Sequence, residues 1–226
     1  VKWANSHIAT ALARQNQVDI SNNSWGTIDF FGDDFNSATY MQDYANIRYA
    51  VETGRDGYGT IFVFSAGNSR TIGDNVNYHN FQNARETITV ASVAQDDTIS
   101  SFSTPGAAIL VAAYGEEILT TDRLGALGYN PNMGPPNPDY ASVQGTSFAA
   151  PEVSAIVALM LEANPDLGYR DVQAILAHST RHPDSASWKV NAADSHNLGG
   201  LYFNDDMGFG IVNAHSAVRL AETWSA

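Results

Sequence analysis

The chain has 226 residues, of which 44% are hydrophobic, enough for one sizeable core and best suited to a single α/β domain. Its 24 acidic and 11 basic residues give a formal net charge of -13, which would repel nucleic acid and anionic membranes, so neither is expected as a partner. Because the chain has no cysteine, disulfides, thiolate metal sites and cysteine nucleophiles are excluded, although the cellular compartment stays open.

Hydrophobic patterning predicts an alternation of helices and strands through the first half of the chain. Continuous apolar runs, expected of strands buried on both faces of a sheet, occupy residues 60–66, 87–93 and 107–113. A shorter strand is expected at 18–26, where it runs into a polar loop. Amphipathic helices are expected at 3–16 and 37–53, the second closed by Gly54. This alternation predicts a mostly parallel sheet flanked by helices.

The second half begins with an irregular stretch, residues 123–140, rich in proline, glycine and asparagine. Helices are expected over 145–164, from 169 to 177 and in a final segment that runs through Trp224. Residues 181–206 are polar and are expected to be rich in loops. Two acidic pairs, Asp96-Asp97 and Glu116-Glu117, are expected to be solvated rather than to bind a ligand.

The expected helix at 145–164 is apolar around nearly its whole circumference. From Phe148 to Ala163 only Glu152, Ser154 and Glu162 are strongly polar, so the helix is predicted to be enclosed by the protein on nearly all sides. At about 1.5 Å per residue the run from Phe148 to Ala163 would span roughly 24 Å, which is short for a membrane-crossing helix. No membrane insertion is therefore predicted.

Ser147 lies where this helix is expected to begin, with Pro151 in the first turn. Free amide donors and the positive end of the helix dipole meet there and would stabilise an anion beside the hydroxyl. A serine nucleophile needs this environment during acyl transfer, although a serine at a helix start is more commonly only an N-cap.

The wider motif favours the nucleophile. The string Gly145-Thr146-Ser147-x-Ala149-Ala150-Pro151 resembles the nucleophile motif of the subtilisin-like serine proteases, or subtilases. The resemblance implies a three-layer α/β fold and a serine endopeptidase that hydrolyses polypeptide substrates through an acyl-enzyme on Ser147. Segments across nearly the whole chain are similar to the kexin and furin-type proprotein convertases of this family. They include Ser24-Trp25-Gly26, Gly54-Arg55-Asp56-Gly57, Gly73-Asp74-Asn75, Leu161-Glu162-Ala163-Asn164-Pro165 and Gly208-Phe209-Gly210-Ile211-Val212.

The resemblance also implies roles in the oxyanion hole and in substrate binding. Ala66-Gly67-Asn68 matches the segment whose Asn carboxamide donates to the oxyanion, although Gly-Asn is also a common turn dipeptide. Ser24-Trp25-Gly26 matches the segment whose backbone pairs with an extended substrate, or else is a strand end with a buried tryptophan. The implied substrate-binding residues are Ser24, Trp25, Gly26, Ala66, Gly67 and Thr146.

Calcium is the expected cofactor, as a weak site. In the convertase branch, acidic residues that match Asp29 and Asp74 help to hold a calcium ion under the specificity pocket, and carboxylate oxygens suit Ca²⁺. However, His79 stands where the convertases place a further pocket aspartate, and Thr104 aligns nearest to their third calcium carboxylate. A basic substrate side chain would meet less negative charge, so strict dibasic specificity is not expected.

The family's catalytic Asp and His precede the Ser-Trp-Gly segment, and neither motif is present here. His7, the only histidine before Ser24, is followed by Ile8-Ala9 rather than Gly-Thr and is expected on a helix. A serine without its general base is not activated, so the chain by itself is expected to be close to inert. We therefore expect residues 1–226 to be the C-terminal portion of a subtilisin-like catalytic domain without its N-terminal strands, partnered by an upstream segment that carries Asp and His.

A rival interpretation is a catalytically inactive, protease-like binding or scaffold domain, which the missing Asp and His would fit directly. Ser147 and Asn68 argue against it, because a purely structural domain has no physical need for both. Another α/β hydrolase is disfavoured, since the Gly-x-Ser-x-Gly elbow does not occur around Ser147. The resemblance implies a secreted, extracellular or periplasmic location.

Overall fold

The computed structural model describes residues 5–124, 127–130, 139–191 and 200–225. Its centre is a sheet of four parallel strands in the spatial order β1-β2-β3-β4. They are β1 (Ile20–Asn23), β2 (Ile61–Ser65), β3 (Thr87–Val93) and β4 (Ile109–Tyr114). The four strands fall within the segments expected from the sequence or within one residue of them, and the parallel pairing confirms the predicted sheet.

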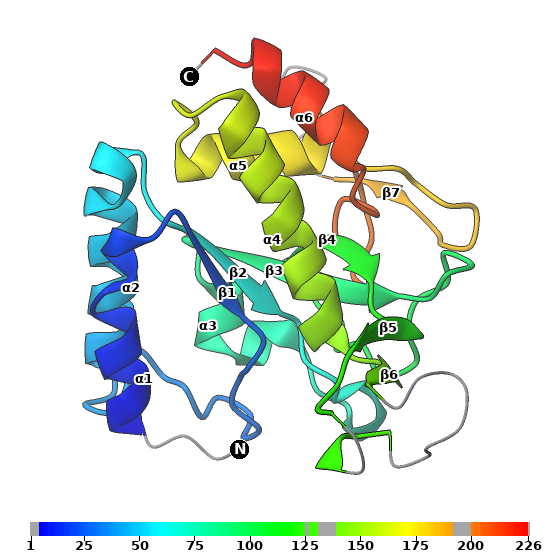
Figure 1. Ribbon diagram of the computed structural model, residues 1–226, viewed down its shortest axis with the longest axis horizontal. Coiled ribbons are helices and arrows are strands. Elements are labelled where there is room, and N and C mark those ends of the chain that lie inside the picture. The colour runs from blue at the N-terminus through cyan, green and yellow to red at the C-terminus, as the bar shows by residue number, and fades with distance from the viewer. Residues whose placement is uncertain (1–4, 125–126, 131–138, 192–199, 226) are drawn as a thin grey trace.

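Helices cover both faces of this sheet (Figure 1). One layer holds α1 (Asn5–Leu12), α2 (Met41–Thr53) and α3 (Asn80–Asn83), and the other holds α4 (Thr146–Ala163), α5 (Tyr169–His178) and α6 (Ala214–Thr223). The arrangement is the predicted three-layer α/β fold. Gly54 follows α2 as predicted, and its N–H donates to Ala50 O in an extended conformation rather than a left-handed one.

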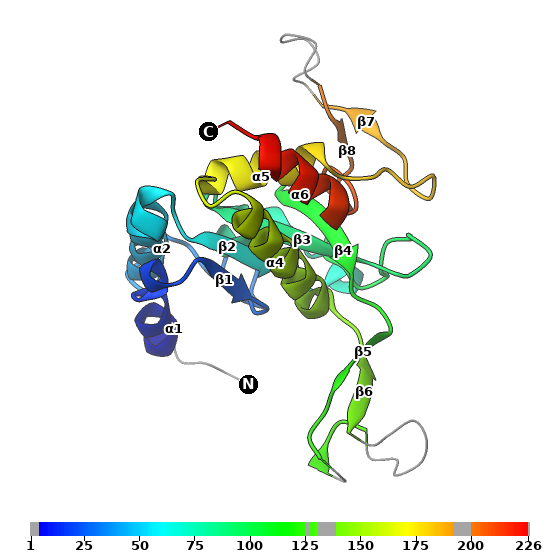
Figure 2. The same cartoon turned by 45° about the horizontal axis from the view of Figure 1, so that its top comes forward.

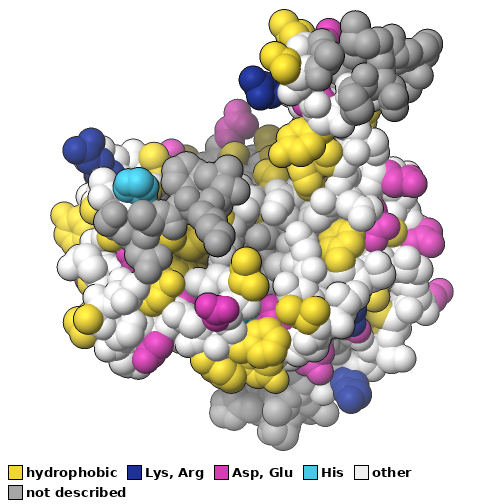
Figure 3. Space-filling view, turned by 90° about the horizontal axis from the view of Figure 1, so that it is seen from below, with side chains coloured by type: hydrophobic (Ala, Val, Ile, Leu, Met, Phe, Trp, Pro, Cys, Tyr) yellow, Lys and Arg dark blue, Asp and Glu magenta, His cyan; other side chains and the backbone are white. Residues whose placement is uncertain are grey.

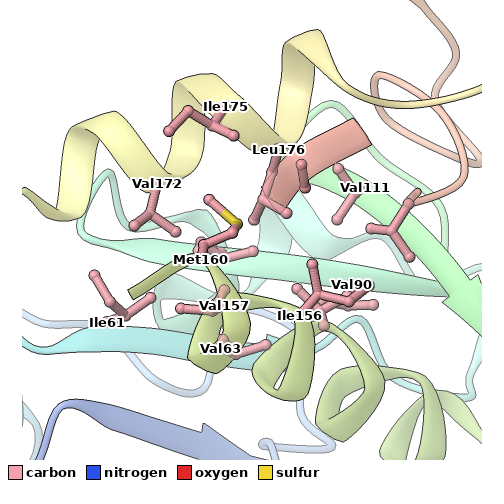
Figure 4. Close-up of a cluster of buried hydrophobic side chains, with 14 of the residues drawn as sticks. Ile61, Val63, Val90, Val111, Ile156, Val157, Met160, Val172, Ile175 and Leu176 are labelled. Carbon is pink, nitrogen blue, oxygen red and sulfur yellow. The ribbon is translucent and has the colours of Figure 1, made fainter. Parts of the chain in front are cut away.

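Side chains of β2 alternate between the two helical layers, as the period of a strand requires. Ile61 and Val63 pack in the cluster beneath α4, whereas Phe62 and Phe64 pack with α2 on the opposite face. Figure 4 shows the first cluster, where Val157 and Met160 of α4 face the strands and Ile175 of α5 lies above them. Each such aliphatic or aromatic side chain stabilises the fold by roughly 1.5–3 kcal/mol when it is fully buried. The strand is thus buried on both faces, as its apolar run predicted.

The prediction that α4 is enclosed on nearly all sides is wrong. Its sheet-facing stripe is buried, but Ala155, Ala158 and Leu159 lie on an exposed face, and Leu159 is 48% exposed. The alanines on this outer face are apolar but expose little surface area to water. A count of apolar residues therefore overestimates how much of the helix is covered by the rest of the protein. The length and hydropathy of α4 would also suit a membrane span, but here α4 contacts all four strands and α6.

An antiparallel arm that the sequence did not predict extends from the body of the molecule (Figure 2). It pairs β5 (Ile118–Thr121) with β6 (Tyr140–Val143), at the two ends of the predicted irregular stretch, much of which lies outside the described residues. A second short pair joins β7 (Lys189–Val190) and β8 (Tyr202–Phe203) within the segment expected to be loop-rich. Strands this short carry too few residues for a periodicity to be recognised.

Candidate active site

The predicted site motifs converge at the carboxyl edge of the sheet. Parallel neighbours end at the same edge, so the residues that follow β1 and β2 meet there, beside the first turn of α4. Together they line a pocket of about 260 Å³. Its walls include all of the predicted catalytic and substrate-binding residues, namely Ser24, Trp25, Gly26, Ala66, Gly67, Asn68, Thr146 and Ser147.

Asn68 and Thr146 fasten the end of β2 to the start of α4. Asn68 Oδ1 accepts from Thr146 N and from Thr146 Oγ1, both at 2.9 Å, and Thr146 Oγ1 in turn accepts from Gly67 N at 3.1 Å. The carboxamide oxygen therefore takes the place of a helix N-cap, because the capping residue Gly145 makes no side-chain bond. The sequence suggested that Ser147 itself could cap, which is wrong, since Ser147 is the second residue of the helix.

These bonds fix the orientation of the Asn68 carboxamide. With Oδ1 committed to Thr146, the Nδ2 group faces away from it, and no described residue accepts a hydrogen bond from Nδ2. Asn68 is exposed to the pocket, so its two amide protons are available to a bound group. An amide donor held in a fixed orientation is able to stabilise negative charge that develops on a bound group.

Thr104 holds the turn that presents Asn68, a role that the sequence did not reveal. Gly67 adopts φ 97°, which favours glycine, and a Cβ there would lie 3.1 Å from Thr104 Oγ1. Thr104 is fully buried, and its hydroxyl accepts a hydrogen bond from Ser69 N at 3.0 Å. Its own N–H donates to Gly67 O at 3.0 Å. Its hydroxyl and its amide therefore clamp the turn from one side.

Ser147 and Ser24 are joined across the pocket. Pro151 lies in the second turn of α4 rather than in the predicted first turn, and it has no N–H to donate to Ser147 O. Ser24 Oγ supplies the missing donor at 2.9 Å, and Ser147 Oγ makes a long bond of 3.5 Å to Ser24 O. Because Pro151 cannot donate to it, the Ser147 carbonyl is free to accept from Ser24, and this bond links the segment after β1 to the candidate nucleophile.

Trp25 and Gly26 shape one wall of the pocket. The Trp25 ring is half-buried and packs edge-on against Phe64 and Phe81, with centroids 5.4 and 5.0 Å apart, so it anchors this segment. A Cβ on Gly26 would lie 2.9 Å from Gln82 Nε2, so a larger residue there would displace the end of the Gln82 side chain. Gln82, which the sequence did not single out, lines the pocket with a buried Oε1 that has no hydrogen-bond partner among the described residues.

The two predicted calcium ligands differ in their surroundings. Asp74 lines the pocket and is buried, whereas Asp29 is exposed and does not line it. Both carboxylate oxygens of Asp74 are engaged by His79 Nε2, at 2.9 and 3.1 Å. In the described part of the chain, no three acidic or histidine side chains are arranged to hold a metal ion. Calcium stays a prediction, but Asp74 as it stands does not fit a calcium ligand, because an N–H donor already occupies it.

His79 lies between two carboxylates beneath the pocket. Its Nδ1 is 3.8 Å from Asp33 Oδ1, and its other nitrogen bonds Asp74. The Asp33 carboxylate raises the pKa of His79, burial opposes this, and Asp74 raises the pKa further. Burial would raise the pKa of Asp33, but the nearby His79 imidazole and the hydrogen bond from the Phe81 N–H outweigh that effect and lower the pKa.

No histidine in the described ranges is hydrogen-bonded to Ser147 Oγ. His79 shares the pocket but is committed to Asp74, and His7 lies exposed on α1, as predicted. The site therefore presents the Ser147 hydroxyl and the Asn68 Nδ2 group beside the segment 24–26, and no general base is seen among the described residues. Figure 3 shows one face of the surrounding surface, where acidic side chains are more frequent than basic ones, in keeping with the net charge.

Comparisons with known proteins show to which family the chain is similar. The rat proprotein convertase subtilisin/kexin type 6 is 34% identical over 221 residues, 94% of this chain and 22% of the relative. Kexin from Saccharomyces cerevisiae is 30% identical over 213 residues, 91% of this chain and 24% of the relative. The crystal structure of the Aeromonas sobria serine protease in complex with its chaperone ORF2 matches with a TM-score of 0.85 and 22% identity, covering 98% of this chain and 46% of that one.

The chain thus spans about a quarter or less of the length of these two curated relatives. The subtilase family matches residues 1–210, a range that takes in every residue of the pocket. With the three-layer fold, the convergent motifs and this match together, the chain belongs to the subtilase family of serine proteases.

Proposed function

We propose that the chain carries the nucleophile half of a serine endopeptidase that cleaves polypeptides. The observation that carries the proposal is the meeting of Ser147, Asn68 and the segment 24–26 in one pocket. In the proposed reaction, Ser147 Oγ attacks the peptide carbonyl to form an acyl-enzyme, and its proton passes to a general base. Asn68 Nδ2 and the Ser147 N–H donate to the oxyanion, because the first turn of α4 leaves that N–H without a helical acceptor.

The general base belongs, in this proposal, to a segment upstream of residue 1 that carries the Asp and His of the family. Two observations support it: no described histidine bonds Ser147 Oγ, and β1 forms an edge of the described sheet, beside which further strands could pair. The chain is then the C-terminal portion of the catalytic domain. A secreted or extracellular location remains a prediction.

The test is labelling with a fluorophosphonate probe, which forms a covalent adduct with activated serines. In the full-length protein we expect one adduct, which mass spectrometry places on Ser147 and which Ser147→Ala removes. Ser154→Ala is the matched control, since Ser154 lies on the same helix but bonds Asn22 and Ala150, and it should be labelled like the unaltered protein. The chain without upstream sequence should react far more slowly. A folded full-length protein that takes no label would support the inactive scaffold instead.

A further inference from the structure

The buried group beneath the pocket consists of Asp33, Asp74 and His79, which are 0%, 6% and 4% exposed. The three residues come from two loops, one after β1 and one between β2 and α3. The imidazole lies between the carboxylates, with Nε2 bonded to both oxygens of Asp74 and Nδ1 3.8 Å from Asp33 Oδ1. Thr27 Oγ1 lies 3.1 Å from the same Nδ1. The ring is therefore held on both sides by polar groups.

Two buried carboxylates that share one site need a positive partner between them, because desolvation and mutual repulsion both oppose their ionisation. A divalent cation is one such partner and would use carboxylate oxygens that are otherwise free. Here the oxygens of Asp74 already receive N–H groups from His79 and from Asn75, the second at 2.8 Å. Asp33 Oδ2 likewise accepts from Phe81 N at 3.0 Å. Asp33 Oδ1 has no hydrogen-bond partner among the described residues, and it faces the imidazole with 3.8 Å to His79 Nδ1.

We propose that the His79 side chain takes the place of a metal ion under the substrate pocket, so that this pocket is built without calcium. The imidazole joins the two loops that a metal would otherwise join, through Asp33 on one side and Asp74 on the other. The inference concerns binding and stability and does not depend on proteolysis.

The experiment compares Ca²⁺ binding and thermal unfolding of the chain with and without Ca²⁺, with a chelator and with Mg²⁺ as a control cation. For the unaltered chain we expect no calorimetric binding signal and the same Tm in Ca²⁺ and in chelator. Asp29→Asn should change neither result, whereas a calcium site at Asp29 and Asp74 requires that it weaken binding. A saturable Ca²⁺ signal with a rise in Tm would overturn the proposal.

A gain of function provides the positive test. His79→Asp replaces the imidazole by a third carboxylate, and we expect it to lower Tm in chelator and to create calcium dependence. Calcium at about 100 times its Kd should then raise the Tm of this variant by roughly 5–10 °C. His79→Gln, which keeps a donor but no positive charge, should lower Tm without any response to Ca²⁺. If His79→Asp does not fold, the measurements on the unaltered chain and on His79→Gln decide the matter; an unchanged Tm for His79→Gln would contradict the proposal.

Discussion

Asn68 uses the two ends of one carboxamide for different purposes. Its oxygen replaces an N-cap for α4 through the two bonds from Thr146, and its nitrogen is left for the pocket. The structural role and the proposed chemical role therefore depend on the same orientation of the amide, since a flipped amide would lose the bond from the Thr146 N–H. Substitutions that remove only the nitrogen donor can therefore be compared with substitutions that remove both the donor and the oxygen acceptor.

We predict that Asn68→Asp and Asn68→Ala both lower kcat in the full-length protein, by about 100-fold to 1000-fold, because each removes the N–H donor. That magnitude comes from a subtilisin, another member of the family, and not from this structure. Asn68→Asp keeps an acceptor for Thr146 and should leave Tm nearly unchanged, whereas Asn68→Ala loses both bonds and should also lower Tm. Steady-state kinetics and thermal unfolding measure the two effects. Full activity in Asn68→Asp would exclude the carboxamide as the oxyanion donor.

At the scale of the element, α4 lacks one backbone hydrogen bond because Pro151 lies inside the helix. Pro151 leaves Ser147 O without its helical donor, and a hydroxyl from outside the helix replaces it. The bond couples the position of the segment after β1 to the first turns of α4. Ser24, directly after β1, thus offsets part of the cost of a proline in the second turn of the helix.

A double-mutant cycle tests this coupling. Ser24→Ala should destabilise the chain by about 1 kcal/mol, because it leaves a partly buried carbonyl without a donor. In a Pro151→Ala background the new amide at position 151 can donate to Ser147 O, so the same Ser24→Ala substitution should cost clearly less. Chemical denaturation of the four proteins gives the coupling energy. Equal costs of Ser24→Ala in both backgrounds would mean that the two residues do not compensate each other.

At the scale of the whole molecule, one charged cluster joins three distant parts of the chain. Asp97, in the turn after β3, forms two bonds with Arg181 beyond α5, and Tyr114 at the end of β4 donates to the same carboxylate at 2.8 Å. The sequence indicated that Asp97 is solvated, and this expectation is wrong, because a partner 84 positions away cannot be identified from local composition. The Arg181 guanidinium lowers the pKa of Asp97 to about 2, below the ordinary value of 3.8.

This shift predicts a dependence of stability on pH. Because the folded state holds the Asp97 proton less tightly than the unfolded state, the contribution is complete above about pH 5 and is lost as the pH falls toward 2. The side chain of Arg181 is 36% exposed, so solvent screening limits the contribution to about 1 kcal/mol. Asp97→Asn should lower the free energy of unfolding at neutral pH. It should also make that free energy fall less steeply as the pH is lowered, in the acid limb of the plot of stability against pH.

The control for this measurement is Glu117→Gln, a substitution at another acidic residue with a left-handed backbone and an exposed side chain. It should leave the acid limb as it is in the unaltered chain. Denaturant titrations at a series of pH values between about 2 and 7 provide the curve. If Asp97→Asn and the unaltered chain lose stability in parallel as the pH falls, the Arg181 pair makes no difference to acid stability.

The sequence by itself determined the parallel sheet, its flanking helices and the motifs around Ser147 and Asn68. These follow from local properties: the period of apolar residues fixes the element, and strands that run parallel bring their carboxyl ends to one edge. The tertiary structure alone decided which atoms of those motifs are engaged. The Asn68 oxygen and the Ser24 hydroxyl bond partners that are 78 and 123 positions away in the sequence. Such pairings depend on how three layers pack, and no local pattern encodes that packing.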